Sequence, residues 1–167
     1  MLFRSRELGG FDDAIELYGE DIEFCWRLHH SGARVVVAPS ARVRHRGDLA
    51  GRRPDLNEVR VAARHRLRTV TTMTGTARLP GRILELVVLT FAELVVGLFT
   101  GRFKQGVASL AALVGLVPRF PSIIARRRVV APMRRVPERE VLGLQLRGRA
   151  RLSSFLRSRD TATYVGT

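Results

Sequence analysis

Two adjacent acids, Glu20 and Asp21, are the residues of this sequence best suited to proton transfer. A carboxylate placed beside a reacting hydroxyl can remove its proton, which contributes roughly 10²–10⁴-fold to a rate. Neighbouring carboxylates also perturb each other's ionisation. Acids at a helix start equally stabilise the exposed N–H groups of the first turn, and the spacing taken alone favours this structural role.

Metal and cofactor signals in the sequence are few. His29 and His30 are adjacent on a predicted helix and point in different directions, which excludes them as a metal-binding pair. The single cysteine, Cys25, excludes an internal disulfide and a multi-cysteine zinc site, and we expect it to fill space in the interior. The sequence contains no Asp-x-Asp triplet and no Gly-rich phosphate loop of the Walker or Rossmann kind.

The segments around the acidic pair predict a loop, a helix, a strand and a second loop. Residues 9–13 (GGFDD) have turn chemistry, and the helix that opens at Glu20 meets a stop signal at Ser31-Gly32. Residues 33–38 (ARVVVA) form a short β-branched run that predicts a buried strand, and residues 41–45 predict a second extended stretch. A helix followed directly by a strand favours an α/β layer.

The rest of the chain predicts helices of increasing apolarity. Residues 55–78 show helical spacing, which Pro80-Gly81 breaks. Two apolar runs follow at 83–99 and 106–117, and the first contains Glu85 and Glu93. A membrane hairpin, a pair of interfacial helices and the buried helices of a soluble domain all fit these runs, although two acids argue against a lipid-exposed span. Arginines border both runs, which favours membrane association.

The charge balance raises a rival interpretation. The chain has 29 basic and 15 acidic residues, for a net charge of +14, and Lys104 is its only lysine. Such a charge attracts nucleic acid, but the aromatic residues are few and no recognition motif is evident, which disfavours nucleic acid as a partner. The basic tail, residues 126–167, is equally consistent with a helix on an anionic lipid surface and with a solvated, partly disordered segment.

Residues 9–47 resemble the acceptor-side segment of glycosyltransferase family 2, the inverting enzymes with a nucleotide-sugar-binding GT-A fold. The resemblance lies in the order of a Gly-Gly-Phe-Asp loop, an acidic helix start with a further acid at Glu23, a strand and a His before Gly. It implies an α/β fold class with a partial GT-A domain in residues 1–54. Apolar, membrane-associated helices (55–125) and a basic helical tail (126–167) would follow it.

The resemblance also assigns roles to residues. It makes Asp21 the base that deprotonates the acceptor hydroxyl, with Glu20 shaping its surroundings. It places Trp26 and Arg27 against acceptor or diphosphate; the alternatives are a packing role for Trp26, the commoner one for Trp, and a solvated helix face for Arg27. His45 would help hold the divalent metal, Mg or Mn, of the complete enzyme, but one His cannot form a metal site and a surface loop His is the alternative.

The implied partners are a nucleotide-sugar donor, a cell-envelope glycan or lipid-linked acceptor, and a membrane with the catalytic part on its cytoplasmic side. Residues 1–4 resemble an interior strand of complete family members, so we expect this chain to be the C-terminal part of a longer enzyme. Alone it would bind neither nucleotide sugar nor metal, and its exposed sheet edge would favour aggregation. A non-catalytic membrane-surface adaptor and a basic nucleic-acid-binding module are the alternative functions.

Overall fold

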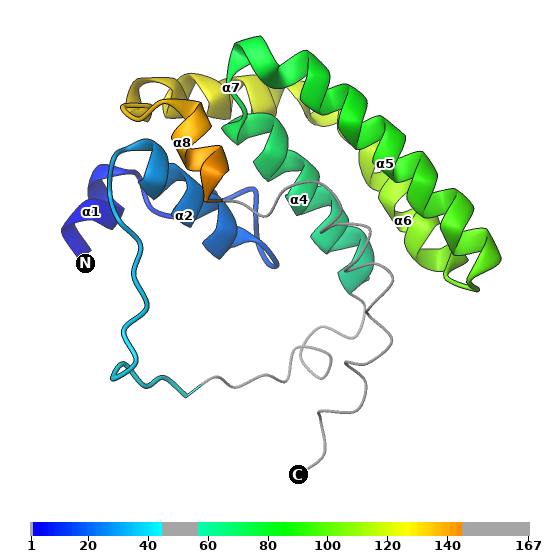
Figure 1. The fold of residues 1–167 in the computed structure, drawn as a ribbon, viewed down its shortest axis with the longest axis horizontal. Helices are drawn as coiled ribbons and strands as arrows, with labels where there is room; N and C mark the ends of the chain where they lie inside the picture. Colours follow the sequence, from blue (N-terminus) through cyan, green and yellow to red (C-terminus); the bar gives the residue numbers. More distant parts are fainter. Residues whose placement is uncertain (1, 45–56, 145–167) are drawn as a thin grey trace.

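Helices form the framework of the part of the chain that this computed structural model describes, residues 2–44 and 57–144 (Figure 1). In chain order they are α1 (Leu2–Glu7), α2 (Glu20–His30), α4 (Glu58–Met73), α5 (Leu79–Phe99), α6 (Phe103–Val114), α7 (Phe120–Val130) and α8 (Glu138–Gly143). Short 3-10 turns at Thr76–Arg78, Val117–Arg119 and Ala131–Met133 connect neighbouring helices. Helix α4 is central, because α2, α5, α6 and α7 all contact it.

The predicted α/β fold, and with it the partial GT-A sheet, is wrong for the described residues, which contain no strand. Residues 33–38 and 41–44 follow an irregular path away from the helices (Figure 1). Val36 and Val37 are 73% and 90% exposed, not buried. A β-branched run favours a strand only where a neighbouring strand and a core supply a half-buried pleated surface, and nothing in the described part of the chain does so here.

The N-terminal segment also departs from expectation. Residues 1–4 were expected to continue an interior strand, but Leu2–Glu7 forms helix α1. In α2, by contrast, both predicted ends are confirmed. Gly19, with φ +107°, leads into the acidic first turn at Glu20, and the chain leaves the helix through Ser31 and the left-handed Gly32 (φ +80°).

Helix α4 begins at a side-chain cap and ends before the predicted break. The Asn57 carboxamide oxygen accepts a hydrogen bond from the backbone N–H of Arg60 at 3.0 Å. The helix ends at Met73, and Pro80, expected to break it, lies in the first turn of α5. Proline is tolerated there because the N–H it lacks would have no partner within the helix.

Helices α5 and α6 form a hairpin whose inner surfaces approach closely. A Cβ added to Gly106 would lie 2.8 Å from the Leu94 Cα, so only glycine allows this separation. On α4, Ala63 and Leu67 pack with Leu86 and Ala112 of the hairpin as one hydrophobic cluster. Within the described residues, no single helix has the length and apolarity to cross a bilayer, whereas α6 and the helical stretch 117–133 meet both criteria together across a 41° bend.

A second hydrophobic cluster connects the two ends of the described chain. Trp26 of α2 packs with Met73 of α4, Val130 of α7 and Val141 of α8. Helices from the predicted regions 1–54, 55–125 and 126–167 therefore contact one another. The division of the chain into three domains at those boundaries stays a prediction.

Candidate functional site

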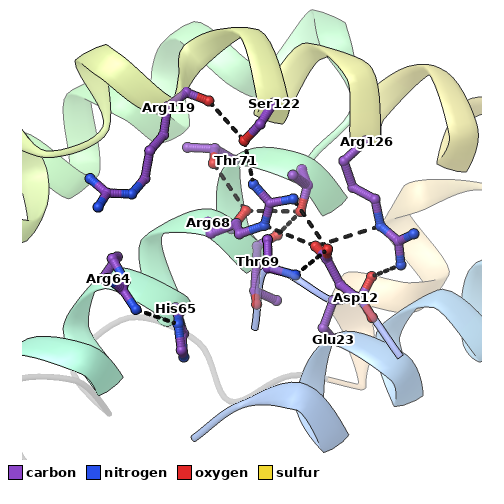
Figure 2. A network of polar contacts seen from close by, with 12 residues as sticks. Asp12, Glu23, Arg64, His65, Arg68, Thr69, Thr71, Arg119, Ser122 and Arg126 are labelled. Atoms are coloured by element: carbon purple, nitrogen blue, oxygen red, sulfur yellow. Dashed lines mark hydrogen bonds and ion pairs between the residues drawn. The ribbon is translucent and has the colours of Figure 1, made fainter. Parts of the chain in front are cut away.

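A buried network of charged side chains holds the loop before α2 against α4 and α7 (Figure 2). Asp12, in the Gly-Gly-Phe-Asp-Asp loop, is 5% exposed and accepts hydrogen bonds from Arg68 Nε at 2.9 Å and Arg68 Nη2 at 3.2 Å. Arg68 also donates from Nη1 to the Ser122 hydroxyl at 2.9 Å. One guanidinium thus connects the loop, α4 and α7.

Glu23 is the second buried carboxylate of this network. Its carboxylate is fully buried and accepts hydrogen bonds from Arg27 at 2.7 Å and from Arg126 of α7 at 3.0 Å. Arg27 donates also to the carbonyl of Leu8 and, at 2.6 Å, to that of Gly10. Since Arg27 is fully buried, the structure places its charge between α2 and the loop, where it positions both.

The electrostatics of this network favour the ionised form of the Asp12 carboxyl group. Burial by itself raises the pKa of Asp12, but the hydrogen bonds and positive charge of Arg68, with a smaller contribution from Arg126, outweigh it and lower that pKa below its usual value. Arg126 Nε lies 3.6 Å from Asp12 Oδ2. Removing one partner of a buried ion pair leaves the other charge uncompensated, which is strongly destabilising. The network therefore holds the loop in a fixed position relative to α2.

The two predicted catalytic acids lie at the start of α2, directly beside this network. Asp21 is exposed, and its Oδ1 accepts a hydrogen bond from the backbone N–H of Ile22 at 2.8 Å. Glu20 is half-buried, and its Oε2 is buried without a hydrogen-bond partner among the described residues. Asp21 therefore presents a carboxylate to solvent from a rigid helix end, which suits either a general base or a helix-stabilising acid.

The other predicted site residues lie in different settings. Trp26 is 7% exposed and lines a cavity between α2 and α4, whereas Arg27 is fully buried in the charge network, bound to Glu23 and to the Gly10 carbonyl. His45 lies outside the described residues. Within residues 2–44 and 57–144 no three His, Cys, Asp or Glu side chains gather as a possible metal site, so these residues alone do not fit a divalent metal.

Two histidines, one at the end of α2 and one in α4, are buried. His65 of α4 has a hydrogen bond between its Nδ1 and the Leu17 carbonyl, and Arg64 Nη2 lies 3.1 Å from its Nε2. Burial lowers the pKa of His65, and the Arg64 charge adds to this effect. Burial likewise lowers the pKa of His30, together with the charge of Arg134. Both rings are therefore held predominantly in the neutral form at pH 7.

Sequence reasoning did not find the roles of Asp12, Arg68 and Arg126. Glu23 and Arg27 are four residues apart on one helix, so their ion pair could have been read from the spacing. Arg68 and Arg126 lie 56 and 103 residues from their partners Asp12 and Glu23, and no local pattern connects such positions.

Comparison with known proteins gives one short similarity. The chain is 48% identical over 40 residues to the pre-mycofactocin glycosyltransferases of two Mycobacterium tuberculosis strains, CDC 1551 / Oshkosh and ATCC 25618 / H37Rv. The match covers 24% of this chain and 8% of each relative, so the chain corresponds to a small part of those proteins. No protein-family model and no solved structure matches the chain. The similarity supports a relationship to glycosyltransferases.

Proposed function

We propose that this chain supplies the acceptor side of an inverting glycosyltransferase of family 2, which moves a sugar from a nucleotide-activated donor to a hydroxyl of a cell-envelope glycan or lipid-linked acceptor. The observation that carries the proposal is the placement of Asp21, exposed at the first turn of a helix that a buried charge network fixes. The short similarity to pre-mycofactocin glycosyltransferases supports the reaction class.

In the proposed reaction, Asp21 accepts the proton of the acceptor hydroxyl. The hydroxyl oxygen then forms a bond to the anomeric carbon, while the bond from that carbon to the nucleotide diphosphate breaks on the opposite face and the diphosphate keeps the electron pair. The configuration at the anomeric carbon is thereby inverted. Glu20, adjacent to Asp21 and half-buried, shapes the surroundings of the base.

Donor binding is assigned to parts of the complete enzyme outside the described residues, and so is the divalent metal, Mg or Mn, that the family resemblance implies. If bound, such a metal would stabilise the charge of the departing diphosphate. The buried network acts on the acceptor side instead. Asp12, Glu23, Arg27 and Arg68 set the position of α2, and the start of α2 sets the position of the Asp21 carboxylate.

The decisive experiment replaces Asp21 with Asn in the complete enzyme. Loss of the base should reduce turnover by about 10²–10⁴-fold while the circular dichroism spectrum stays unchanged. Asp13→Asn is the matched control, because Asp13 is also an exposed acid of the same segment. Turnover of the Asp21→Asn enzyme at the wild-type rate would contradict the assigned role.

Membrane attachment is part of the proposal, with the catalytic part on the cytoplasmic side. An exposed stripe on α5 supports it: Leu84, Val88, Phe91, Val95 and Leu98 are each 50% exposed or more. Their spacing of three and four residues places them on one face of the helix, opposite the buried Leu86, Thr90 and Glu93. The whole chain has a net charge of +14, which would attract it to an anionic bilayer, and the apolar stripe would then contact the surface of that bilayer.

A further inference from the structure

Two adjoining cavities lie between α4 and the connection from α6 to α7. Their volumes are about 220 Å³ and about 260 Å³. Arg64 of α4 and Arg119 of the turn before α7 line both cavities, and Arg60 lines the larger one. In Figure 2, Arg64 and Arg119 lie on the side of Arg68 that faces away from Asp12. Three guanidinium groups, from two distant parts of the chain, therefore meet around one hollow.

These three arginines have no ion-pair partner among the described residues. Within residues 2–44 and 57–144, Glu16 is the one acid in the walls of either cavity, and it pairs with none of them. Other acids of α5 and α8 are already paired: Glu93 with Arg66, Glu138 with Arg78 and Glu85 with Arg82. The buried network beside the hollow has three guanidinium groups and two carboxylates, so it supplies no excess negative charge.

Neutral acceptors hold two of the three guanidinium groups in position. The Nδ1–H of His65 donates to the Leu17 carbonyl, so its Nε2 accepts from Arg64 Nη2 at 3.1 Å. Arg119 Nη1 donates to the Gly115 carbonyl at 2.7 Å. A guanidinium has five N–H donors, and each of these two uses one of them on the described part of the chain. Both therefore keep their full charge and most of their donors for a ligand.

Uncompensated positive charge around a hollow calls for an anion, and the residue type indicates which one. The paired N–H groups of a guanidinium match two oxygens of a phosphate or a carboxylate. Three arginines exceed the single charge of a carboxylate, whereas a phosphate monoester has about 1.5 to 2 negative charges at pH 7 and three acceptor oxygens. The larger cavity also contains Arg60 and Val61 of the first turn of α4, where the helix dipole favours an anion.

We infer that Arg60, Arg64 and Arg119 form a binding site for a phosphate monoester group. A soluble phosphate ester and the headgroup of phosphatidic acid both present this group. Asp21 lines neither cavity, so the site does not depend on the proposed reaction. Asp21→Asn should leave phosphate binding unchanged, and a failure of the proposed base is thereby distinguishable from a failure of this site.

The test uses the full 167-residue chain and one probe for each source of the phosphate group. Isothermal titration calorimetry measures binding of glycerol 3-phosphate, and flotation measures binding to phosphatidylcholine vesicles with about 10% phosphatidic acid. Arg64→Gln/Arg119→Gln removes two charges from the site. Arg128→Gln/Arg139→Gln is the matched control, because it removes the same charge from two exposed arginines without an ion pair among the described residues.

We expect at least one probe to bind the wild type and the control pair equally, and the site pair about tenfold more weakly, because charge-assisted hydrogen bonds are lost. Binding of glycerol 3-phosphate assigns the site to a soluble ester, and binding of the vesicles alone assigns it to a lipid headgroup. The exposed stripe of α5 is intact in all variants, so only the difference between the two pairs reports on the site.

Arg60→Gln provides a second test that does not depend on buried contacts. Its side chain is exposed and has no hydrogen bond within the described part of the chain, so the variant should keep the urea midpoint of the wild type. It should bind the same probe about threefold more weakly, and Arg128→Gln should not. Absence of binding to both probes, or equal weakening by the site pair and the control pair, would overturn the inference.

Discussion

Arg68 binds Asp12 through two hydrogen bonds, from Nε at 2.9 Å and from Nη2 at 3.2 Å, across 56 residues of sequence. Both side chains are nearly inaccessible to solvent. The pair joins the Gly-Gly-Phe-Asp-Asp loop to α4, and a third contact from Arg68 Nη1 to Ser122 adds α7. The loop that precedes the candidate base is thus fixed by the interior of the molecule as well as by its own turn residues, since Gly9 and Gly10 have positive φ and Asp12 Oδ1 also accepts a hydrogen bond from the backbone N–H of Ala14 at 3.2 Å.

Removing one partner of this pair should destabilise the protein strongly. Asp12→Ala leaves the guanidinium of Arg68 buried without its carboxylate, and we expect a loss of about 3–5 kcal/mol in the free energy of unfolding. Asp13→Ala, at the adjacent exposed acid, should change it by less than about 0.5 kcal/mol. Urea unfolding followed by circular dichroism measures both. Equal unfolding midpoints for the two variants would contradict a structural role of the pair.

The contact between α5 and α6 should depend on the absence of a side chain at Gly106. In Gly106→Ala the new Cβ would meet the Leu94 Cα at 2.8 Å and the Glu93 carbonyl at 3.2 Å, so the helices must separate. We expect a loss of about 1–3 kcal/mol, as for other overpacked sites. Gly81→Ala, in the first turn of α5, is the control because its Cβ meets nothing within 4 Å. It should leave stability unchanged or raise it slightly.

The sequence predicted the local features of this fold and missed its long-range ones. Both ends of α2 were found, because an acidic first turn and Ser31-Gly32 act within a few residues of the backbone that they terminate. The strand at 33–38 was predicted wrongly, because β-branched residues indicate only the ability to pair, and a partner strand is a property of the whole chain.

In the candidate site, too, the sequence predicted the local features and missed the long-range contacts. Glu20 and Asp21 were predicted at the helix start where the structure places them, since a first turn is a local feature. The partners that hold this turn, Arg68 and Arg126, were not found, because their connection depends on how α4 and α7 pack. Periodicity separates apolar from polar faces, and it cannot distinguish a buried, paired arginine such as Arg68 from a solvated one.

Stability should fall as the solution is acidified from pH 7.5 to pH 5.5. Burial lowers the pKa of His30 and of His65 in the folded state, whereas in the unfolded chain both titrate near 6.5. The unfolded state therefore binds more protons below about pH 6.5, and protonation favours it. Urea midpoints measured at pH 7.5, 6.5 and 5.5 should decrease in that order.

Substitution of a buried histidine identifies the source of this dependence. His65→Gln removes one of the two titrating groups and should flatten the decrease between pH 7.5 and 5.5. His29→Gln, on the same helix as His30 but only half-buried, leaves both buried rings in place and should preserve it. A pH dependence that is unchanged in His65→Gln would contradict the assignment to that ring.

The exposed stripe of α5 should mediate binding to anionic lipid. Phe91 and Val95 lie in its middle, 52% and 50% exposed, so burial of their side chains at a bilayer surface removes apolar area from water. We expect the full chain to float with vesicles of phosphatidylcholine and phosphatidylglycerol (about 7:3), and the Phe91→Glu/Val95→Glu variant to remain in the lower fractions. The matched control is Val37→Glu, an equally apolar residue that is 90% exposed outside the helices.

Salt separates the apolar contribution from the electrostatic one. Binding through the arginines alone should disappear at about 1 M NaCl, where charges are screened within roughly 3 Å. Binding through the stripe should persist there and be lost only in Phe91→Glu/Val95→Glu. Equal flotation of this variant and the wild type would show that the stripe does not contact lipid, and concentration-dependent dimerisation abolished by the same two substitutions would instead assign it to a second copy of the chain.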